Sequence, residues 1–190
     1  MASLFSSINQ SSYDTTIQTN APPMENVETF FSLKTPTPKE TQSDEPIVQT
    51  VSYEVPTVNT NFKAYTDYRC ITSRSSAQWK IRQQSYTDEN GLRKVDDYYC
   101  IALGSYYGTS IGDKYRITLD NGNSFLAILA DVKMDIHTDP TNRYVESNGN
   151  LVEFYVDTKL VDPMILNLGT VSYLEQLRGN VVQVERFLEP

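Results

Sequence analysis

Residues 113–122 read DKYRITLDNG and carry the clearest structural signal in the chain. The apolar residues of this stretch alternate with polar ones, which is the period of two that a half-buried β-strand shows. The Asn121-Gly122 pair at its end is the strongest short-range signal for a β-hairpin turn. We therefore predict a strand, a tight turn and a second strand that begins in the long run SFLAILADVKMDIHTD at 124–139.

The rest of the chain after residue 60 also has the pattern of short β-strands. Runs with β-type content recur between turn residues, at 77–87, 97–108, 151–158 and 180–187. One short helix is expected around 162–168, with Gly169 as its stop, followed by a second helical turn. About six strands at short spacing with few helices are typical of a small closed barrel. The predicted fold class is mainly β.

Charge and hydropathy exclude several kinds of partner. The 190 residues include 16 basic and 24 acidic ones, for a formal net charge of −8. An acidic chain repels phosphate backbones, so we expect no nucleic-acid partner. No apolar run approaches the roughly 18 residues of a membrane span, so we expect no membrane partner. The N-terminal stretch 1–16 has neither a basic region nor an apolar core, which predicts no signal peptide.

Residues 1–60 differ in composition from residues 61–190. They hold no Gly, six of the nine Pro, and seven acidic residues against two lysines. Such a segment cannot bury enough apolar area to offset its chain entropy, so we predict a disordered or extended arm before a folded domain at 61–190. It is either a solvated tail or an arm that orders on a partner. The second interpretation uses Phe30 and Phe31 as anchors and a strand at 47–55 for edge pairing.

A run of alternating charges at 130–140 is the first candidate site. If this run is extended, one face carries Asp131, Lys133, Asp135, His137 and Asp139. The face is either the solvent side of an edge strand or part of a catalytic groove. Asp131 is the strongest catalytic candidate because it directly follows an apolar run. Partial desolvation favours the protonated carboxyl group that a general acid needs near neutral pH.

Metal and thiol chemistry receive less support. Asp135, His137 and Asp139 are ligand types that suit a divalent ion, but no multi-His spacing accompanies them, so we predict no metal and no cofactor. Two cysteines cannot make a four-ligand zinc site. Cys70 and Cys100 each lie in apolar strand context, which is typical of buried thiols, and a disulfide between them is the alternative.

The loop that contains Gly104, Tyr106 and Tyr107 is a second candidate site. Glycines on either side of adjacent tyrosines make a flexible loop with aromatic faces, which suits stacking on sugar rings. The alternative is an ordinary connection in which the tyrosines cap the barrel and the glycines serve the turn geometry.

Several motifs together resemble a group of phage and Firmicutes proteins. The motifs are YCIALGSYYG (99–108), IGDKY (111–115), DNG (120–122), ADVKMD (130–135), HTD (137–139) and VEF (152–154). That group is similar to the double-psi β-barrel superfamily, which includes membrane-bound lytic transglycosylase A, rare lipoprotein A-like proteins and expansins. The resemblance covers roughly residues 70–187.

The resemblance implies a six-stranded double-psi β-barrel that holds a glycan across its groove. It implies Asp131 as the single acid/base of a lytic-transglycosylase-like cleavage of peptidoglycan. The expected substrate-binding residues are Lys133, Asp135, His137, Asp139, Gly104, Tyr106 and Tyr107. The implied location is a phage virion, with other virion or tail proteins bound through residues 1–60. The alternatives are a non-catalytic structural virion protein, with the barrel as a mount and the arm as a tether, and a non-catalytic glycan-binding module.

Overall fold

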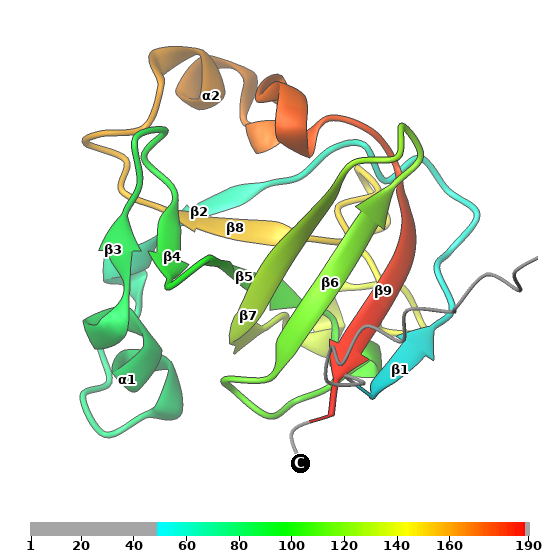
Figure 1. Cartoon of the computed structure of the whole chain (residues 1–190), viewed down its shortest axis with the longest axis horizontal. Helices are drawn as coiled ribbons and strands as arrows, with labels where there is room; N and C mark the ends of the chain where they lie inside the picture. The colour runs from blue at the N-terminus through cyan, green and yellow to red at the C-terminus, as the bar shows by residue number, and fades with distance from the viewer. Residues whose placement is uncertain (1–48, 189–190) are drawn as a thin grey trace, which may run out of the picture. The chain divides into compact units, whose positions relative to one another are not determined.

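The computed structural model describes residues 49–188, and this part of the chain is mainly β (Figure 1). Its nine strands form one mixed sheet. The strands are β1 (Thr50–Tyr53), β2 (Tyr65–Asp67), β3 (Tyr86–Thr87), β4 (Arg93–Val95), β5 (Tyr98–Leu103), β6 (Lys114–Leu119), β7 (Ser124–Val132), β8 (Glu153–Val156) and β9 (Val181–Phe187). The helices are α1 (Ala77–Gln84) and α2 (Pro163–Leu168), with single 3₁₀ turns at η1 (Tyr68–Cys70), η2 (Ser105–Tyr107), η3 (Asp135–His137), η4 (Val171–Tyr173) and η5 (Glu175–Leu177).

The predicted hairpin is confirmed and forms the centre of the sheet. β6 and β7 pair antiparallel on either side of the Asn121-Gly122 turn, and Gly122 has the positive φ of 87° that such turns need. β9 and then β1 continue the sheet beyond β6, both antiparallel. On its other side β7 pairs with β5 in parallel, β5 pairs with β8 antiparallel, and β8 pairs with β2 in parallel. In Figure 1, β2 and β8 run at a steep angle to β6 and β9.

Two groups of buried side chains hold this sheet. The larger group lies on the inner face and includes the fully buried Tyr107, Tyr115 and Phe154. The smaller group lies under α1, where Ile81 packs with residues of β5, β7 and β8. Burying each large apolar side chain contributes about 1.5–3 kcal/mol. The side chains of both groups belong to elements that are distant in sequence and meet only in the tertiary fold.

The prediction of β-structure at 77–87 is wrong for most of that segment. Residues 77–84 form α1, and only Tyr86–Thr87 is a strand. Ser76 caps the helix by accepting a hydrogen bond from the Trp79 backbone N–H at 3.1 Å. Ile81 is buried and Trp79 is half-buried against the smaller core group, so one helix face covers the sheet. Tertiary packing of these apolar residues selects the helix.

The strand predicted at 47–55 does pair, and the folded domain begins earlier than residue 61. β1 lies antiparallel to β9, with Thr50 opposite Phe187. Thr60 is fully buried, and its hydroxyl accepts a hydrogen bond from Val181 N at 2.8 Å. Phe30 and Phe31 lie outside the described residues.

The predicted helix at 162–168 is confirmed as α2. Asp162 caps its start by accepting from Met164 N at 2.7 Å. Gly169 ends it in the left-handed conformation, with φ 70° and ψ 14°. The second helical turn that was expected after it is present as η4 and η5.

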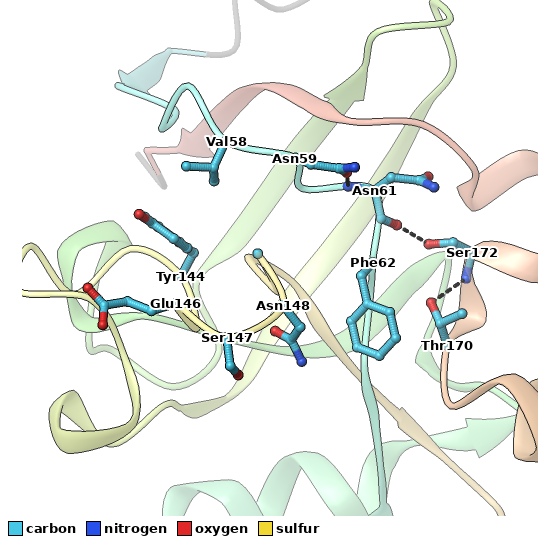
Figure 2. A pocket seen from close by; sticks show the side chains of 11 residues that line it. Val58, Asn59, Asn61, Phe62, Tyr144, Glu146, Ser147, Asn148, Thr170 and Ser172 are labelled. Carbon is cyan, nitrogen blue, oxygen red and sulfur yellow. Dashed lines mark hydrogen bonds between the residues drawn. The ribbon is translucent and has the colours of Figure 1, made fainter.

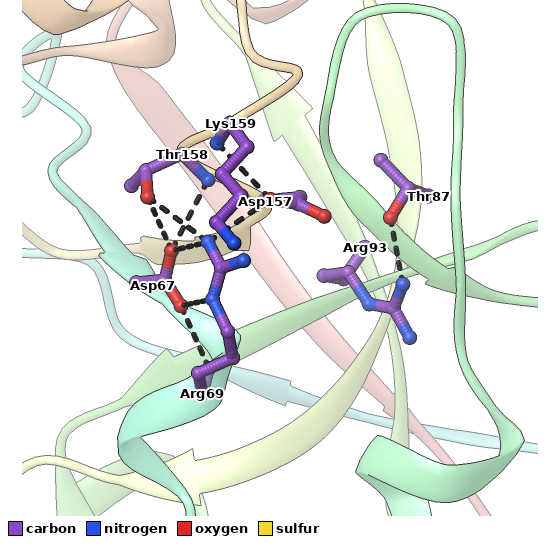
Figure 3. Close-up of polar contacts among 7 residues, drawn as sticks. All are labelled: Asp67, Arg69, Thr87, Arg93, Asp157, Thr158 and Lys159. Carbon is purple, nitrogen blue, oxygen red and sulfur yellow. Dashed lines mark hydrogen bonds and ion pairs between the residues drawn. The ribbon is translucent and has the colours of Figure 1, made fainter.

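A polar cluster at the carboxyl ends of β2 and β8 holds this parallel pair together (Figure 3). The Arg69 guanidinium binds Asp67 at 2.5 Å and Asp157 at 3.0 Å. Asp67 also accepts from the backbone N–H of Thr158 at 3.2 Å. The Arg69 hydrogen bond holds the pKa of Asp67 well below its usual range. Both strands are short, so these charge-assisted contacts add to a small number of ladder bonds.

Both cysteines are free thiols. Cys100 is buried as expected, and burial raises its pKa to about 12. Cys70 is exposed, which corrects the expectation of a second buried thiol, because β2 has ended and the chain has left the sheet at η1. Within residues 49–188 we find no helix that is long and apolar enough to cross a membrane.

Candidate functional site

A β-bulge near the end of β7 determines where Asp131 points. The parallel register pairs Ile101 of β5 with Leu129 and then Ala102 with Asp131, so β7 has one extra residue there. Leu129 packs into the inner core and Ala130 into the group under α1. Without the extra residue, a period of two would return Asp131 to the inner face. The bulge instead brings its side chain toward α1, and bulges commonly re-aim side chains in this way.

The Asp131 carboxylate is held by side chains from two other elements and by the backbone of the next residue. Its Oδ2 accepts a hydrogen bond from the Tyr155 hydroxyl of β8 at 2.9 Å. Its Oδ1 accepts from Gln78 Nε2 of α1 at 3.3 Å and from the Val132 backbone N–H at 2.9 Å. Tyr155 is buried, which fixes the position of its hydroxyl. Asp131 thus has a defined orientation between the sheet and α1.

A polar pocket opens beside this carboxylate, with a volume of about 250 Å³. Asp131 is the one acidic residue among those lining it, and the others are Cys70, Ile71, Thr72, Ser73, Ser76 and Gln78. Hydroxyl and amide groups therefore surround a single carboxylate. Such a lining offers hydrogen bonds to a neutral, hydroxyl-rich ligand.

The other ionisable groups at this pocket stay protonated at neutral pH. Burial, and next the charge of Asp131, raise the pKa of the Tyr155 hydroxyl. Partial desolvation raises the pKa of the Cys70 thiol. A thiol with a raised pKa is a poor nucleophile, because the thiolate is the reactive form. Asp131 is therefore the group at this pocket suited to acid/base chemistry.

The single charged face predicted for residues 131–139 is wrong. β7 ends at Val132, and the chain then turns into η3. Lys133 is buried, whereas Met134 and Ile136 are 64% and 82% exposed, so the expected apolar face lies in solvent. The alternation fails because the extended backbone on which it depends stops before these residues.

The predicted partners of Asp131 have other roles in this loop. The Lys133 ammonium donates to the carbonyl oxygens of Asn150 at 2.6 Å and Leu151 at 3.0 Å. Burial alone raises the pKa of Asp139, but the Thr141 hydroxyl and three backbone N–H groups outweigh it and lower the pKa to about 2. Lys133 and Asp139 therefore hold loop backbone in place.

Asp135 and His137 lie on η3, and both side chains are exposed. Asp135 accepts a hydrogen bond from the Ser105 hydroxyl at 2.6 Å, which ties η3 to η2. Among residues 49–188 we find no group of three or more His, Cys, Asp or Glu side chains placed to hold a metal ion.

The tyrosine loop packs against the protein itself. Tyr107 is fully buried, so its ring presents no face to a sugar and the prediction of a platform there is wrong. Its carbonyl accepts a hydrogen bond from the Tyr115 hydroxyl at 3.0 Å. Tyr106 is 39% exposed and lies edge-to-face with Tyr53 and Tyr107, with the Arg143 guanidinium 5.4 Å from its ring centroid.

Gly104 serves a close backbone contact. A Cβ atom there would lie 2.0 Å from the carbonyl oxygen of Asn142, so only glycine fits at this approach of two loops. Its φ of −64° is available to any residue, and the constraint is therefore one of space. The tyrosine loop and the η3 loop thus meet as structural neighbours.

The residues that hold Asp131 were missed by sequence reasoning. Gln78 lies in a segment taken for a strand, and Tyr155 is one of 13 tyrosines. No short motif links either of them to Asp131, which is 53 residues from Gln78 and 24 from Tyr155 in sequence. Comparison with family models, with curated proteins and with solved structures finds no match.

Proposed function

We propose that this protein is a glycan-binding barrel that cleaves peptidoglycan strands, with Asp131 as its single acid/base. The observation that carries the proposal is the Asp131 carboxyl group, which a β-bulge turns toward a neutral polar pocket and which Tyr155 and Gln78 orient. Oriented carboxyl groups of this kind are suited to proton transfer at a glycosidic oxygen.

The strand pairing supports a closed six-stranded double-psi barrel as the finer fold. Six strands pair in one continuous order, β2-β8-β5-β7-β6-β9, with two parallel pairs among them. At the ends of this order, Thr60 N donates to Asn180 Oδ1 at 2.9 Å and Val181 N donates to the Thr60 hydroxyl at 2.8 Å. These bonds bring the chain before β2 against the start of β9, which favours closure. The strands β1, β3 and β4 are then additions to the barrel.

The first step of the proposed reaction breaks the glycosidic bond. Protonated Asp131 gives its proton to the glycosidic oxygen while the bond from that oxygen to the anomeric carbon breaks. The leaving sugar departs with a free hydroxyl group, and Asp131 becomes a carboxylate. The hydrogen bonds from Tyr155 and Gln78 then stabilise this negative charge.

The second step closes the product ring. The Asp131 carboxylate takes the proton of the C6 hydroxyl of the same muramyl sugar as that oxygen bonds to the anomeric carbon. The product is a 1,6-anhydro sugar, Asp131 is protonated again, and no water is consumed. One carboxyl group serves both steps, whereas hydrolysis by an ordinary glycosidase uses two. This agrees with the single acidic residue in the pocket lining.

The proposed location is a phage virion, and the proposed protein partners are virion or tail proteins bound through residues 1–60. The support is the resemblance of the motifs between residues 99 and 154 to phage proteins. A wall-cleaving barrel carried in the virion would open the bacterial wall during entry.

The test is digestion of purified peptidoglycan followed by mass spectrometry of the soluble products. We expect anhydro-muropeptides from the wild-type protein and none from Asp131→Asn, which keeps the shape of the side chain. Asp97→Asn is the matched control, because it removes an exposed carboxylate that does not line the pocket. Near-UV and far-UV circular dichroism of all three proteins verifies their folds.

Each outcome of this digestion decides between named alternatives. Anhydro products that are lost only in Asp131→Asn support the proposal. Products that persist in Asp131→Asn exclude Asp131 as the acid/base. Products with a reducing end indicate hydrolysis rather than ring closure. Absence of products from the wild type, across several wall types, overturns the enzymatic proposal.

A non-catalytic structural barrel is the second candidate function, and the tyrosine loop favours it. Tyr106 and Tyr107 pack on Tyr53, which lies in the edge strand β1. The aromatic residues of this loop therefore bind the edge strand to the domain. In that role the segment before β1 would tether the domain to a larger assembly.

A further inference from the structure

A second pocket lies between the loops that precede β2 and β8, and it is separate from the pocket at Asp131 (Figure 2). Its volume is about 430 Å³. The two pockets share no lining residue. This second pocket is lined by Val58, Asn59, Asn61, Phe62, Tyr144, Glu146, Ser147, Asn148, Gly149, Thr170 and Ser172. None of these residues has a role in the reaction proposed above.

Three asparagines of this pocket have carboxamides whose orientation is fixed by the protein. Asn59 Oδ1 accepts from Asn61 N at 3.0 Å, Asn61 Oδ1 from Gly179 N at 2.8 Å, and Asn148 Oδ1 from Asn150 N at 3.0 Å. A backbone N–H requires an oxygen as its acceptor, so each amide has only one assignment. Within residues 49–188, no group accepts a hydrogen bond from the Nδ2 of these three side chains. The lining therefore offers oriented donors to a ligand.

Apolar and acidic groups complete the lining. Phe62 and Tyr144 are both half-buried and contribute ring surface to the pocket. Figure 2 shows Phe62 and Asn148 among the side chains that line the pocket. Glu146 is exposed and is the one charged side chain among the lining residues. The charge of its carboxylate disfavours an anionic ligand.

The backbone around the pocket is held rigidly. A Cβ atom at Gly149 would lie 1.9 Å from the Asn59 carbonyl oxygen, so the two loops touch there. The fully buried Lys63 donates to the carbonyl oxygens of Asn61 at 3.3 Å and Gly179 at 2.6 Å. The Ser172 hydroxyl also donates to the Asn61 carbonyl oxygen. A pocket whose walls are fixed in this way binds without a large ordering cost.

We infer that this pocket is a carbohydrate-binding site for a neutral, N-acetylated sugar, distinct from the site at Asp131. The acetamido carbonyl is a strong acceptor for the Asn Nδ2 donors. The acetyl methyl and the C–H face of the ring cover apolar surface on Phe62. Sugar binding at this pocket does not require bond cleavage at Asp131.

The test is titration of the whole protein with chitotetraose, an N-acetylglucosamine tetramer, followed by isothermal calorimetry and by ¹H–¹⁵N NMR. We expect saturable binding and a shift of the Asn148 side-chain NH₂ signals. Phe62→Ala should weaken binding about tenfold or more, because one buried ring face is lost. Ser147→Trp should abolish binding by filling the pocket, since Ser147 is exposed and its hydroxyl makes no hydrogen bond within residues 49–188.

Matched controls separate this site from other surfaces. Tyr86→Ala removes an exposed aromatic ring outside the pocket and should leave binding unchanged. Binding is read out here without product analysis, which distinguishes this inference from the proposed cleavage. Cellotetraose has the same backbone without acetamido groups and should bind at least tenfold more weakly.

Three results would overturn the inference. One is the absence of saturable chitotetraose binding to the wild-type protein. Another is full binding by Ser147→Trp, which locates the sugar elsewhere. Equal affinity for cellotetraose would remove the acetamido group from the recognition.

Discussion

Two buried lysines make the stability of this fold depend on pH in a defined direction. The ammonium groups of Lys63 and Lys133 each donate to two backbone carbonyl oxygens. Burial lowers the pKa of each from 10.5 to about 8, and the nearby charges of Asp120 and Glu153 oppose this shift only in part. The folded state therefore binds these two protons more weakly than the unfolded chain does.

The sign and size of the effect follow from linkage. Stability rises with pH wherever the unfolded state holds more protons, which here is between about pH 8 and pH 10.5. Between pH 7 and pH 9 each lysine is expected to add about 1.3 kcal/mol to the free energy of unfolding. The raised pKa of Cys100 opposes this by about 0.4 kcal/mol at pH 9, because only the unfolded thiol ionises there. The expected net rise is about 2 kcal/mol.

The assay is urea unfolding at pH 7, 8 and 9, followed by fluorescence of Trp79, which is the single tryptophan. Wild-type protein is compared with Lys63→Met and Lys133→Met at constant salt and reductant. Each variant leaves two carbonyl groups without their donor and will be less stable overall. We therefore compare how the free energy of unfolding changes with pH within each variant. Between pH 7 and pH 9 we expect it to rise in each variant by about half as much as in the wild type.

The result that refutes this reasoning is a wild-type unfolding free energy that stays flat or falls between pH 7 and pH 9. Variants with the same pH dependence as the wild type would refute it equally, because the titrating groups would then lie elsewhere.

Three further predictions address single contacts. Tyr155→Phe removes the hydroxyl that orients Asp131, so we expect kcat for peptidoglycan cleavage to fall about 10- to 100-fold with little change in KM. A rise in KM by the same factor, with kcat unchanged, would indicate lost substrate binding instead. Gly104→Ala forces the Asn142 carbonyl away and should cost about 1–3 kcal/mol in thermal unfolding, and an unchanged Tm would show that the two loops are not in close contact. Asp67→Asn should lower the free energy of unfolding at neutral pH. The difference in this free energy between variant and wild type should shrink as the pH falls below about 4, because the wild-type carboxylate is then protonated in the unfolded chain. A difference that stays constant down to pH 2 would mean that the charge of Asp67 does not stabilise the fold.

Local sequence patterns predicted the structure correctly wherever a few neighbouring residues determine the backbone conformation. The Asn121-Gly122 turn follows from conformational preference alone. The end of α2 at Gly169 follows in the same way, since glycine adopts the left-handed conformation at little cost. The alternation in β6 also predicted which of its residues are buried, because one face of this strand packs on the core and the other does not.

Local sequence patterns failed where contacts with distant segments determine the conformation. The stretch at 77–84 has apolar side chains that suit a strand or a helix, and contact of Ile81 with the sheet selects the helix. At 133–137 the alternation continues in the sequence, but the strand has already ended at Val132. Lys133 is then buried because carbonyl groups of the loop before β8 accept its ammonium protons.

The sequence by itself determined that this chain is mainly β, where its central hairpin turns, and that Asp131 follows an apolar strand. The tertiary structure decided what Asp131 faces, because the bulge forms only when β7 pairs with β5. Its partners Tyr155 and Gln78 arrive from a later strand and an earlier helix. The second pocket likewise joins loops more than a hundred residues apart, from Val58 to Ser172. Periodicity reports on neighbours along the chain, whereas a site is made by neighbours in space.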